Sequence, residues 1–146
     1  MRIGHQEALP ALHWLEGRNL TVSGLPGSGH WLLANGARAG YYRVNYDADN
    51  WRLLARDLAA LSDLERAGLV DDALALAGAG LLGYDVVLDL LNRLPRGEPS
   101  LAWVAAVPWL SKITHLLHGS TGEWGEAYRK SAAQVNQNAV PYMCSS

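Results

Sequence analysis

The hydrophobic pattern changes its period near residue 46, and this change constrains the fold more than any other feature. Between residues 41 and 46 apolar and polar side chains alternate, with Tyr42, Val44 and Tyr46 on one face. This period is typical of a half-buried strand. After Asp47 apolar residues recur every three or four positions, which is typical of amphipathic helices. The sequence therefore predicts a mainly α chain with a small β part at its N-terminal end.

Short apolar runs interrupted by turn residues fill the first 46 residues. The runs cover residues 12–15, 20–22, 30–34 and 41–46. Glycine and proline are dense between Ser23 and Gly29, which predicts a loop there. We expect three or four strands in residues 1–46, with edges that no other segment of this chain closes.

Two helices are predicted directly after this part. Asp47 can cap the first helix. Its apolar stripe is Trp51, Leu54, Leu58 and Leu61. Ser62 and Glu65 form a capping box that opens the second helix, which should end in the glycines at 78 and 80. The stripe of this second helix is Leu64, Ala67, Val70, Leu74 and Ala77.

Two further helices would complete an array of helical hairpins over residues 47–118. The third covers about residues 84–94, and the fourth begins near Glu98 and Pro99. The predicted stripe of the fourth helix is Leu101, Val104, Ala105, Trp109, Ile113, Leu116 and Leu117. Pro108 lies inside this helix and should kink or split it. Residues 119–146 are expected to form a short helix around 123–135 and a polar tail.

Composition excludes several classes of protein. The chain has 12 Lys and Arg against 14 Asp and Glu, so it presents no basic field for nucleic acid. The apolar, nearly uncharged stretch at residues 73–84 is about half of the roughly 20 residues that span a bilayer, so no membrane span is expected in this chain. Cys144 is the single cysteine and can form no internal disulfide. The first residues lack the apolar centre of a secretory signal.

Two glycine-rich runs imitate nucleotide-binding motifs. Residues 24–31 have the glycine spacing of a phosphate-binding loop, but His30 and Trp31 stand where the motif needs lysine and a hydroxyl. A plain hairpin loop is the favoured interpretation. Residues 78–83 fit the dinucleotide glycine pattern, yet they follow a helix instead of a strand. We interpret them as a turn between two helices.

Neither metal-binding nor catalytic residues can be assigned. His115 and His118 lie on one helix face and could share a metal ion, but no further ligand stands at a spacing that completes the set. A polar helix end is the ordinary explanation. Asp71 and Asp72 lack a partner for acid–base chemistry, so we expect one to be solvated and the other to bind a cation such as Arg66 or Lys112. The sequence therefore predicts no catalytic residue, no cofactor-binding residue and no metal ligand in this chain.

One tripeptide has a meaning that depends on the compartment. Asn19-Leu20-Thr21 is an acceptor sequence for N-linked glycosylation on a predicted loop edge. It would matter only if the mature protein were extracellular.

Several stretches together resemble one enzyme family. They are Trp31–Asn35, Gly40–Asp47, Trp51, Arg66-Ala67, Leu69–Ala73, Leu76-Ala77, Tyr84, Glu98 and Trp103–Ala106. This pattern is similar to the segment that joins the third and fourth domains of aminopeptidase N-type zinc metallopeptidases, the gluzincin aminopeptidases. Residues 13–29 resemble the preceding strand and loop of the small β-sandwich domain of that family. The resemblance covers about residues 13–118.

The resemblance implies a fragment with two parts. Residues 1–46 would be the end of the β-sandwich domain, residues 47–118 the start of the helical C-terminal domain, and residues 119–146 a poorly defined end. Gly68 and Pro108 replace residues that suit a helix better in relatives, and they should weaken their helices by about 1 and about 3 kcal/mol.

The same resemblance implies a function that this chain does not perform alone. In the family, zinc and the exopeptidase motif belong to an upstream metallopeptidase domain, and none of those residues maps onto this chain. We expect the chain to roof the active-site cleft, with peptide substrate and the missing upstream domain as partners. The relatives it looks most like are plasma-membrane ectoenzymes, although no signal or anchor is recognisable here. The alternative is a non-catalytic helical module for protein interaction.

Overall fold

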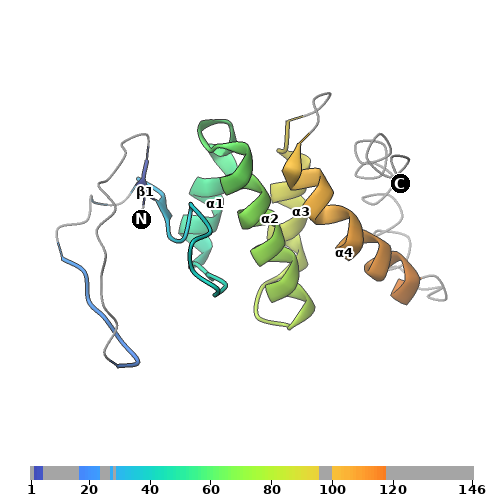
Figure 1. The fold of residues 1–146 in the computed structure, drawn as a ribbon, viewed down its shortest axis with the longest axis horizontal. Helices are drawn as coiled ribbons and strands as arrows, with labels where there is room; N and C mark the ends of the chain where they lie inside the picture. Colours follow the sequence, from blue (N-terminus) through green and yellow to red (C-terminus); the bar gives the residue numbers. More distant parts are fainter. Residues whose placement is uncertain (1, 5–16, 24–26, 28, 96–99, 118–146) are drawn as a thin grey trace.

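The computed structural model describes residues 2–4, 17–23, 27, 29–95 and 100–117. Four α-helices dominate this part of the chain: α1 (Ala48–Arg56), α2 (Asp63–Gly78), α3 (Tyr84–Asn92) and α4 (Leu101–Leu117). A short 3-10 helix, η1 (Leu58–Ala60), follows α1. The helices succeed one another along the long axis of the molecule, with the strands at the opposite end from α4 (Figure 1). The predicted mainly α fold is confirmed.

The β part is smaller than predicted. Within the described residues, the only sheet pairs β1 (Arg2–Ile3) with β2 (Leu32–Leu33) in antiparallel register. Residues 20–22 and 41–46 form no strand, and residues 12–15 lie outside the described part. The expectation of three or four strands is therefore wrong for the residues that the structure describes. The alternation at 41–46 is real only in part, because Val44 and Tyr46 are half-buried whereas Tyr42 is exposed.

The cap of α1 is confirmed. One Asp47 carboxylate oxygen accepts the backbone N–H of Asn50 at 2.8 Å. The helix ends at Arg56, earlier than the stripe suggests, and η1 carries the chain onward. The four stripe residues are nevertheless at most 3% exposed: Trp51, Leu54, Leu58 and Leu61. A 3-10 turn thus preserves the buried face that the helical spacing predicts.

Helix α2 is the centre of the array and contacts both α3 and α4. Its capping box is confirmed, since Ser62 Oγ accepts the N–H of Glu65 at 3.3 Å and Glu65 Oε2 accepts the N–H of Ser62 at 2.8 Å. The helix stops where predicted, because Gly80 adopts a positive φ of 73° that favours glycine. Of the predicted stripe, Val70, Leu74 and Ala77 are buried and Ala67 is half-buried, whereas Leu64 is 49% exposed.

The start of α4 is fixed by α2. Asp63 accepts the hydroxyl of Ser100 at 2.8 Å with one oxygen and the N–H of Leu101 at 3.0 Å with the other. These bonds lower the pKa of Asp63, chiefly through the Leu101 N–H, which favours the carboxylate. The helix continues across Pro108, so the predicted split does not occur.

The buried face of α4 differs from the predicted stripe. The residues that face the core are Ala102, Trp103, Ala106 and Leu110. Leu101 and Val104, which the stripe placed inside, are 51% and 56% exposed. Apolar side chains occur on nearly every side of this helix, so spacing alone does not select one face. Ala102, Trp103 and Ala106 are at most 1% exposed, whereas Trp109 and Ile113 of the predicted stripe are partly buried against the core.

Candidate functional site

Residues 34–46, which we call the strap, fold back on themselves through one asparagine. Asn35 Nδ2 donates to the carbonyl oxygens of Gly40 at 2.9 Å and Tyr42 at 3.2 Å, and Asn35 Oδ1 accepts the N–H of Gly40 at 2.9 Å. Asn35 and Arg38 both have positive φ, at 52° and 54°. A side chain therefore supplies the hydrogen bonds that a neighbouring strand would supply in a sheet.

Two arginines of the strap bind two aspartates of α2, and we call these four residues the arginine–aspartate cluster. Arg38 Nη1 lies 3.0 Å from Asp72 Oδ2, and its Nη2 lies 3.3 Å from Asp71 Oδ2. Arg43 Nη1 lies 2.7 Å from Asp71 Oδ2 and 3.3 Å from Asp72 Oδ1. The Asp72 side chain is only 6% exposed. Two positive and two negative charges balance at a nearly buried site, as burial of charge requires.

Further bonds join the cluster to its surroundings. Asp72 Oδ2 also accepts the N–H of Val44 at 3.2 Å, and Arg38 Nη1 donates to the carbonyl oxygen of Gly68 at 3.4 Å. Asp71 Oδ1 accepts the indole N–H of Trp109 at 3.3 Å, so the same carboxylate reaches α4. The cluster therefore ties the strap, α2 and α4 together.

The predicted partners of these aspartates are wrong. Arg66 instead donates to the carbonyl oxygen of Leu58 at 3.4 Å and lies 3.9 Å from Asp63. Lys112 lies over the ring of Trp109, 5.5 Å from its centroid. Neither aspartate is left to solvent, because each binds both strap arginines. No local pattern predicts this pairing, because about 30 positions separate the partners.

The chemistry of the cluster is structural. Its carboxylate oxygens already accept hydrogen bonds from guanidinium, backbone and indole groups. Such oxygens hold neighbouring segments in place and leave no free acid–base pair of the kind that proton-transfer catalysis needs. Sequence reasoning missed Arg38, and it treated Arg43 only as the polar side of a strand.

Polar side chains attach the strand to α1 and join the two ends of the strap. Asn50 Oδ1 accepts the N–H of Leu32 at 2.7 Å, and its Nδ2 donates to the Leu32 carbonyl oxygen at 2.9 Å. The Tyr46 hydroxyl accepts the N–H of Ala34 at 3.0 Å. Burial raises the pKa of Tyr46 to about 12, because the charged phenolate would lose its hydration.

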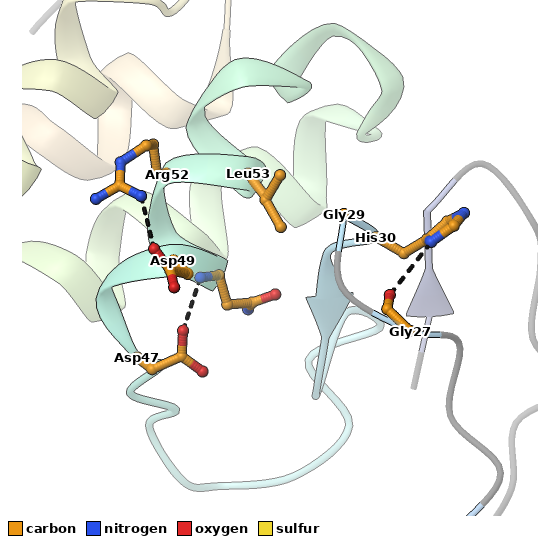
Figure 2. A pocket seen from close by; sticks show the side chains of 8 residues that line it. Gly27, Gly29, His30, Asp47, Asp49, Arg52 and Leu53 are labelled. Atoms are coloured by element: carbon orange, nitrogen blue, oxygen red, sulfur yellow. Dashed lines mark hydrogen bonds and ion pairs between the residues drawn. The ribbon is translucent and has the colours of Figure 1, made fainter.

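A cavity of about 410 Å³ lies beside the start of α1 (Figure 2). Its lining is Gly27, Gly29, His30, Asp47, Asp49, Asn50, Arg52 and Leu53. His30 lies across the cavity from Asp49 and Arg52, as Figure 2 shows. The polar groups bind within the chain, since Asp47 caps α1 and Arg52 lies 2.6 Å from Asp49. This lining offers no lysine for a phosphate. The hairpin interpretation of the glycine run is not supported, because residues 20–22 form no strand and β2 pairs with β1; residues 24–26 and 28 of the run lie outside the described part.

The remaining candidates can be placed as follows. His115 is exposed on α4, and His118 lies outside the described residues. In the part of the chain that the structure describes, no three His, Cys, Asp or Glu side chains gather in a way that could hold a metal ion, so these residues do not fit a zinc site. The glycines at 78–83 connect α2 to α3, as predicted. No helix among the described residues is sufficiently long and apolar to cross a membrane.

The outer side of α4 exposes apolar side chains. Leu101 and Val104 are 51% and 56% exposed and lie one helical turn apart. Ser111, about two turns beyond Val104, is also exposed. Leu101 and Val104 form a small exposed apolar surface that could fit a protein contact.

Comparisons with known proteins agree on one family. The family described as "ERAP1-like C-terminal domain" matches residues 31–139. The chain is 44% identical over 93 residues to human thyrotropin-releasing hormone-degrading ectoenzyme, which covers 61% of this chain and 9% of that protein. It is 38% identical over 95 residues to aminopeptidase N of Plutella xylostella, covering 62% and 10%. It is also 38% identical over 106 residues to human glutamyl aminopeptidase, covering 70% and 11%. The chain thus spans about a tenth of the length of these relatives.

Proposed function

Because the chain belongs to the ERAP1-like C-terminal domain family, we propose that it is the helical part of a zinc aminopeptidase. In this role the chain roofs the active-site cleft and restricts which peptides reach it. Zinc and the groups that cleave the peptide bond belong to the upstream metallopeptidase domain. The observation that carries the proposal is the match of residues 31–139 to this family, joined by relatives that are named as aminopeptidases.

The packing of the described residues favours a structural role as a roof. A roof must keep its shape when a peptide binds beneath it, because its contribution depends on geometry that exists before binding. The arginine–aspartate cluster and the Asp63 bonds to α4 hold the strap, α2 and α4 together. The carboxylates involved are committed to these bonds, so their chemistry supports architecture.

The names of the relatives support a location for this function. One relative is an ectoenzyme by name, and another, from Manduca sexta, is called membrane alanyl aminopeptidase. We therefore extend the proposal to the outer side of the cell, where the chain would act on peptides outside the membrane.

A peptidase assay tests the catalytic part of this proposal. The full chain is incubated with zinc and a fluorogenic amino-acid amide, and release of the fluorophore is followed. We expect no turnover above that of zinc alone. Zinc-dependent turnover that disappears with a chelator would contradict the assignment of catalysis to another domain.

A binding experiment tests the roof. The metallopeptidase domain of human glutamyl aminopeptidase is added to the full chain, and complex formation is measured by titration calorimetry. Hydrolysis of a short amide is then compared with hydrolysis of a longer peptide. A roof should change KM for the longer peptide more than KM for the amide, because only the longer peptide reaches it. Equal effects on both substrates, or no binding, would count against the proposal.

The alternative function is a non-catalytic helical module for protein interaction. The exposure of Leu101 and Val104 on α4 favours it. Val104→Glu tests this face, and Leu81→Glu is the matched control because it adds the same charge at an exposed apolar position outside α4. If the chain does not bind the metallopeptidase domain but captures a different protein through Val104, the alternative replaces the first proposal.

A further inference from the structure

We propose that Asn19 carries an N-linked glycan. The inference rests on the proposed function in one respect, because it needs the chain to pass through the secretory pathway. The site lies in a different part of the molecule, the described segment 17–23, which forms neither helix nor strand.

The sequence offers one acceptor for such a glycan. Asn19-Leu20-Thr21 is the only place in the 146 residues where a serine or threonine stands two positions after an asparagine. The middle residue is leucine, and only proline is excluded there. Because the sequence has a single acceptor, any N-linked glycan on these 146 residues must lie at Asn19.

The structure leaves this asparagine open to modification. Asn19, Leu20 and Thr21 are all exposed, and the surrounding segment forms neither helix nor strand. A surface loop of this kind is where an acceptor asparagine is expected. The attached sugars would extend into solvent beside Leu20, whose side chain is 49% exposed.

The contrast with the other asparagines of this half of the chain strengthens the argument. Asn35 Nδ2 donates to Gly40, Asn45 Nδ2 donates to Leu81, and Asn50 Nδ2 donates to Leu32. The glycosidic bond would form at this same amide nitrogen. Those three side chains hold the fold together, whereas Asn19 is an exposed residue of a segment without helix or strand.

The position of the segment is compatible with a bulky group. In Figure 1 the blue segment that contains Asn19 lies at the end of the molecule opposite α4. A glycan at this end leaves the outer side of α4 uncovered. It therefore does not obstruct the surface that the alternative function would use.

The transfer itself is a substitution at a sugar carbon. The donor class is a lipid-linked oligosaccharide, in which C1 of the first N-acetylglucosamine is bonded to dolichyl diphosphate. Asn19 Nδ2 forms a bond to C1 while the C1–oxygen bond to the diphosphate breaks. The amide nitrogen loses one proton, and dolichyl diphosphate leaves with the bonding electrons. No oxidant or reductant is required.

Expression of the full chain behind a cleavable secretory signal peptide in mammalian cells tests the proposal. Chain from inside the cells and from the medium is treated with peptide N-glycosidase, and its mobility and mass are measured. We expect one mobility shift, with aspartate at position 19 after the glycan is released. Mass analysis of the peptide that contains residue 19 locates the change directly.

Matched variants separate the glycan from an effect on folding. Asn19→Gln and Thr21→Ala should both abolish the shift, whereas Thr21→Ser should keep it. Asn92→Gln is the control, because Asn92 is an exposed asparagine outside any acceptor sequence. Wild-type chain that enters the pathway without gaining a glycan would overturn the proposal, as would a shift that persists in Asn19→Gln.

The outcome does not depend on the aminopeptidase proposal. The glycan is detected without any catalytic partner, and binding to the metallopeptidase domain can be measured with Asn19→Gln. If Asn19→Gln binds that domain while the wild-type chain gains no glycan, only the glycan proposal fails. If the glycan is found and no binding occurs, only the proposed function fails.

Discussion

The replacement Asp72→Asn tests the arginine–aspartate cluster with the least change of shape. Asparagine has nearly the same size as aspartate and keeps one oxygen that can accept a hydrogen bond. It removes one negative charge from a group of two arginines and two aspartates, so the cluster gains a net positive charge. The burial of Asp72 and its contacts set the expected loss of stability.

The cost lies between that of a buried and that of an exposed ion pair. Removing one partner of a fully buried pair costs about 3–5 kcal/mol, whereas an exposed pair contributes about 0–1 kcal/mol. Asp72 is 6% exposed, but Arg38 and Arg43 are 29% and 44% exposed, and Asp71 still compensates part of their charge. We therefore expect Asp72→Asn to lower the free energy of unfolding by about 2 kcal/mol.

Asp72→Ala should cost more. It also removes the acceptor of the Val44 N–H, which lies 3.2 Å from Asp72 Oδ2. An unsatisfied buried donor costs about 1–3 kcal/mol. The alanine variant should therefore lose about 1 kcal/mol more than the asparagine variant.

Urea unfolding of the full chain, followed by far-ultraviolet circular dichroism, measures both values. The denaturant slope should stay unchanged, because the surface exposed on unfolding is the same. Asp49→Asn is the matched control, since Asp49 also pairs with an arginine but is 85% exposed. The control should change stability by less than about 0.5 kcal/mol.

A double-mutant cycle with Arg38→Gln completes the test. If Arg38 and Asp72 interact as the 3.0 Å distance indicates, the double variant should lose at least 0.5 kcal/mol less than the sum of the single variants. Additive effects, or an Asp72→Asn cost no greater than that of Asp49→Asn, would refute the reasoning.

Three further changes have expected outcomes. Gly68→Ala should lower the free energy of unfolding by about 1 kcal/mol despite alanine's better helix propensity, because a Cβ would lie 2.7 Å from Arg38 Cδ. In an Arg38→Ala background the same replacement should raise the free energy of unfolding, as measured by urea unfolding. The stability supplied by Tyr46 is complete below pH 10 and should fall as pH rises toward its folded pKa of about 12, so Tyr46→Phe should flatten this alkaline loss in thermal melts. Pro108→Ala should raise the free energy of unfolding by about 1–3 kcal/mol, because it restores a helical N–H, whereas the exposed Ser111→Ala should change it by less than about 0.5 kcal/mol in the same urea series.

The features that the sequence could predict are those set by neighbouring residues. The Asp47 cap, the Ser62–Glu65 capping box and the end of α2 near Gly80 all occur where expected. Each depends on hydrogen bonds or backbone angles within a few positions. Local interactions of this kind form in the same way however the helices pack against one another.

The features that failed depend on partners far away in the chain. The strap has the alternation of a strand, but its backbone is bound by the side chains of Asn35 and Asp72, and no spacing rule contains that information. The orientation of α4 buries Ala102, Trp103 and Ala106, and a helix that is apolar on nearly every side does not reveal this orientation in its sequence. The salt-bridge partners of Asp71 and Asp72 likewise lie about 30 positions upstream.

The predicted boundary at residues 46–47 marks a change in hydrophobic period, but the apolar core includes residues on both sides of it. Trp31 and Leu33 are 1% and 3% exposed and belong to the same apolar cluster as the helices. Arg38 supplies charge that the nearly buried Asp72 needs. Without residues 31–46 the helices would lose the two arginines that balance Asp72 and the buried side chains of Trp31 and Leu33, so we expect them to be less stable than the full chain. We propose that the unit which unfolds together begins near Trp31, where the strand, the strap and the helices first share one core.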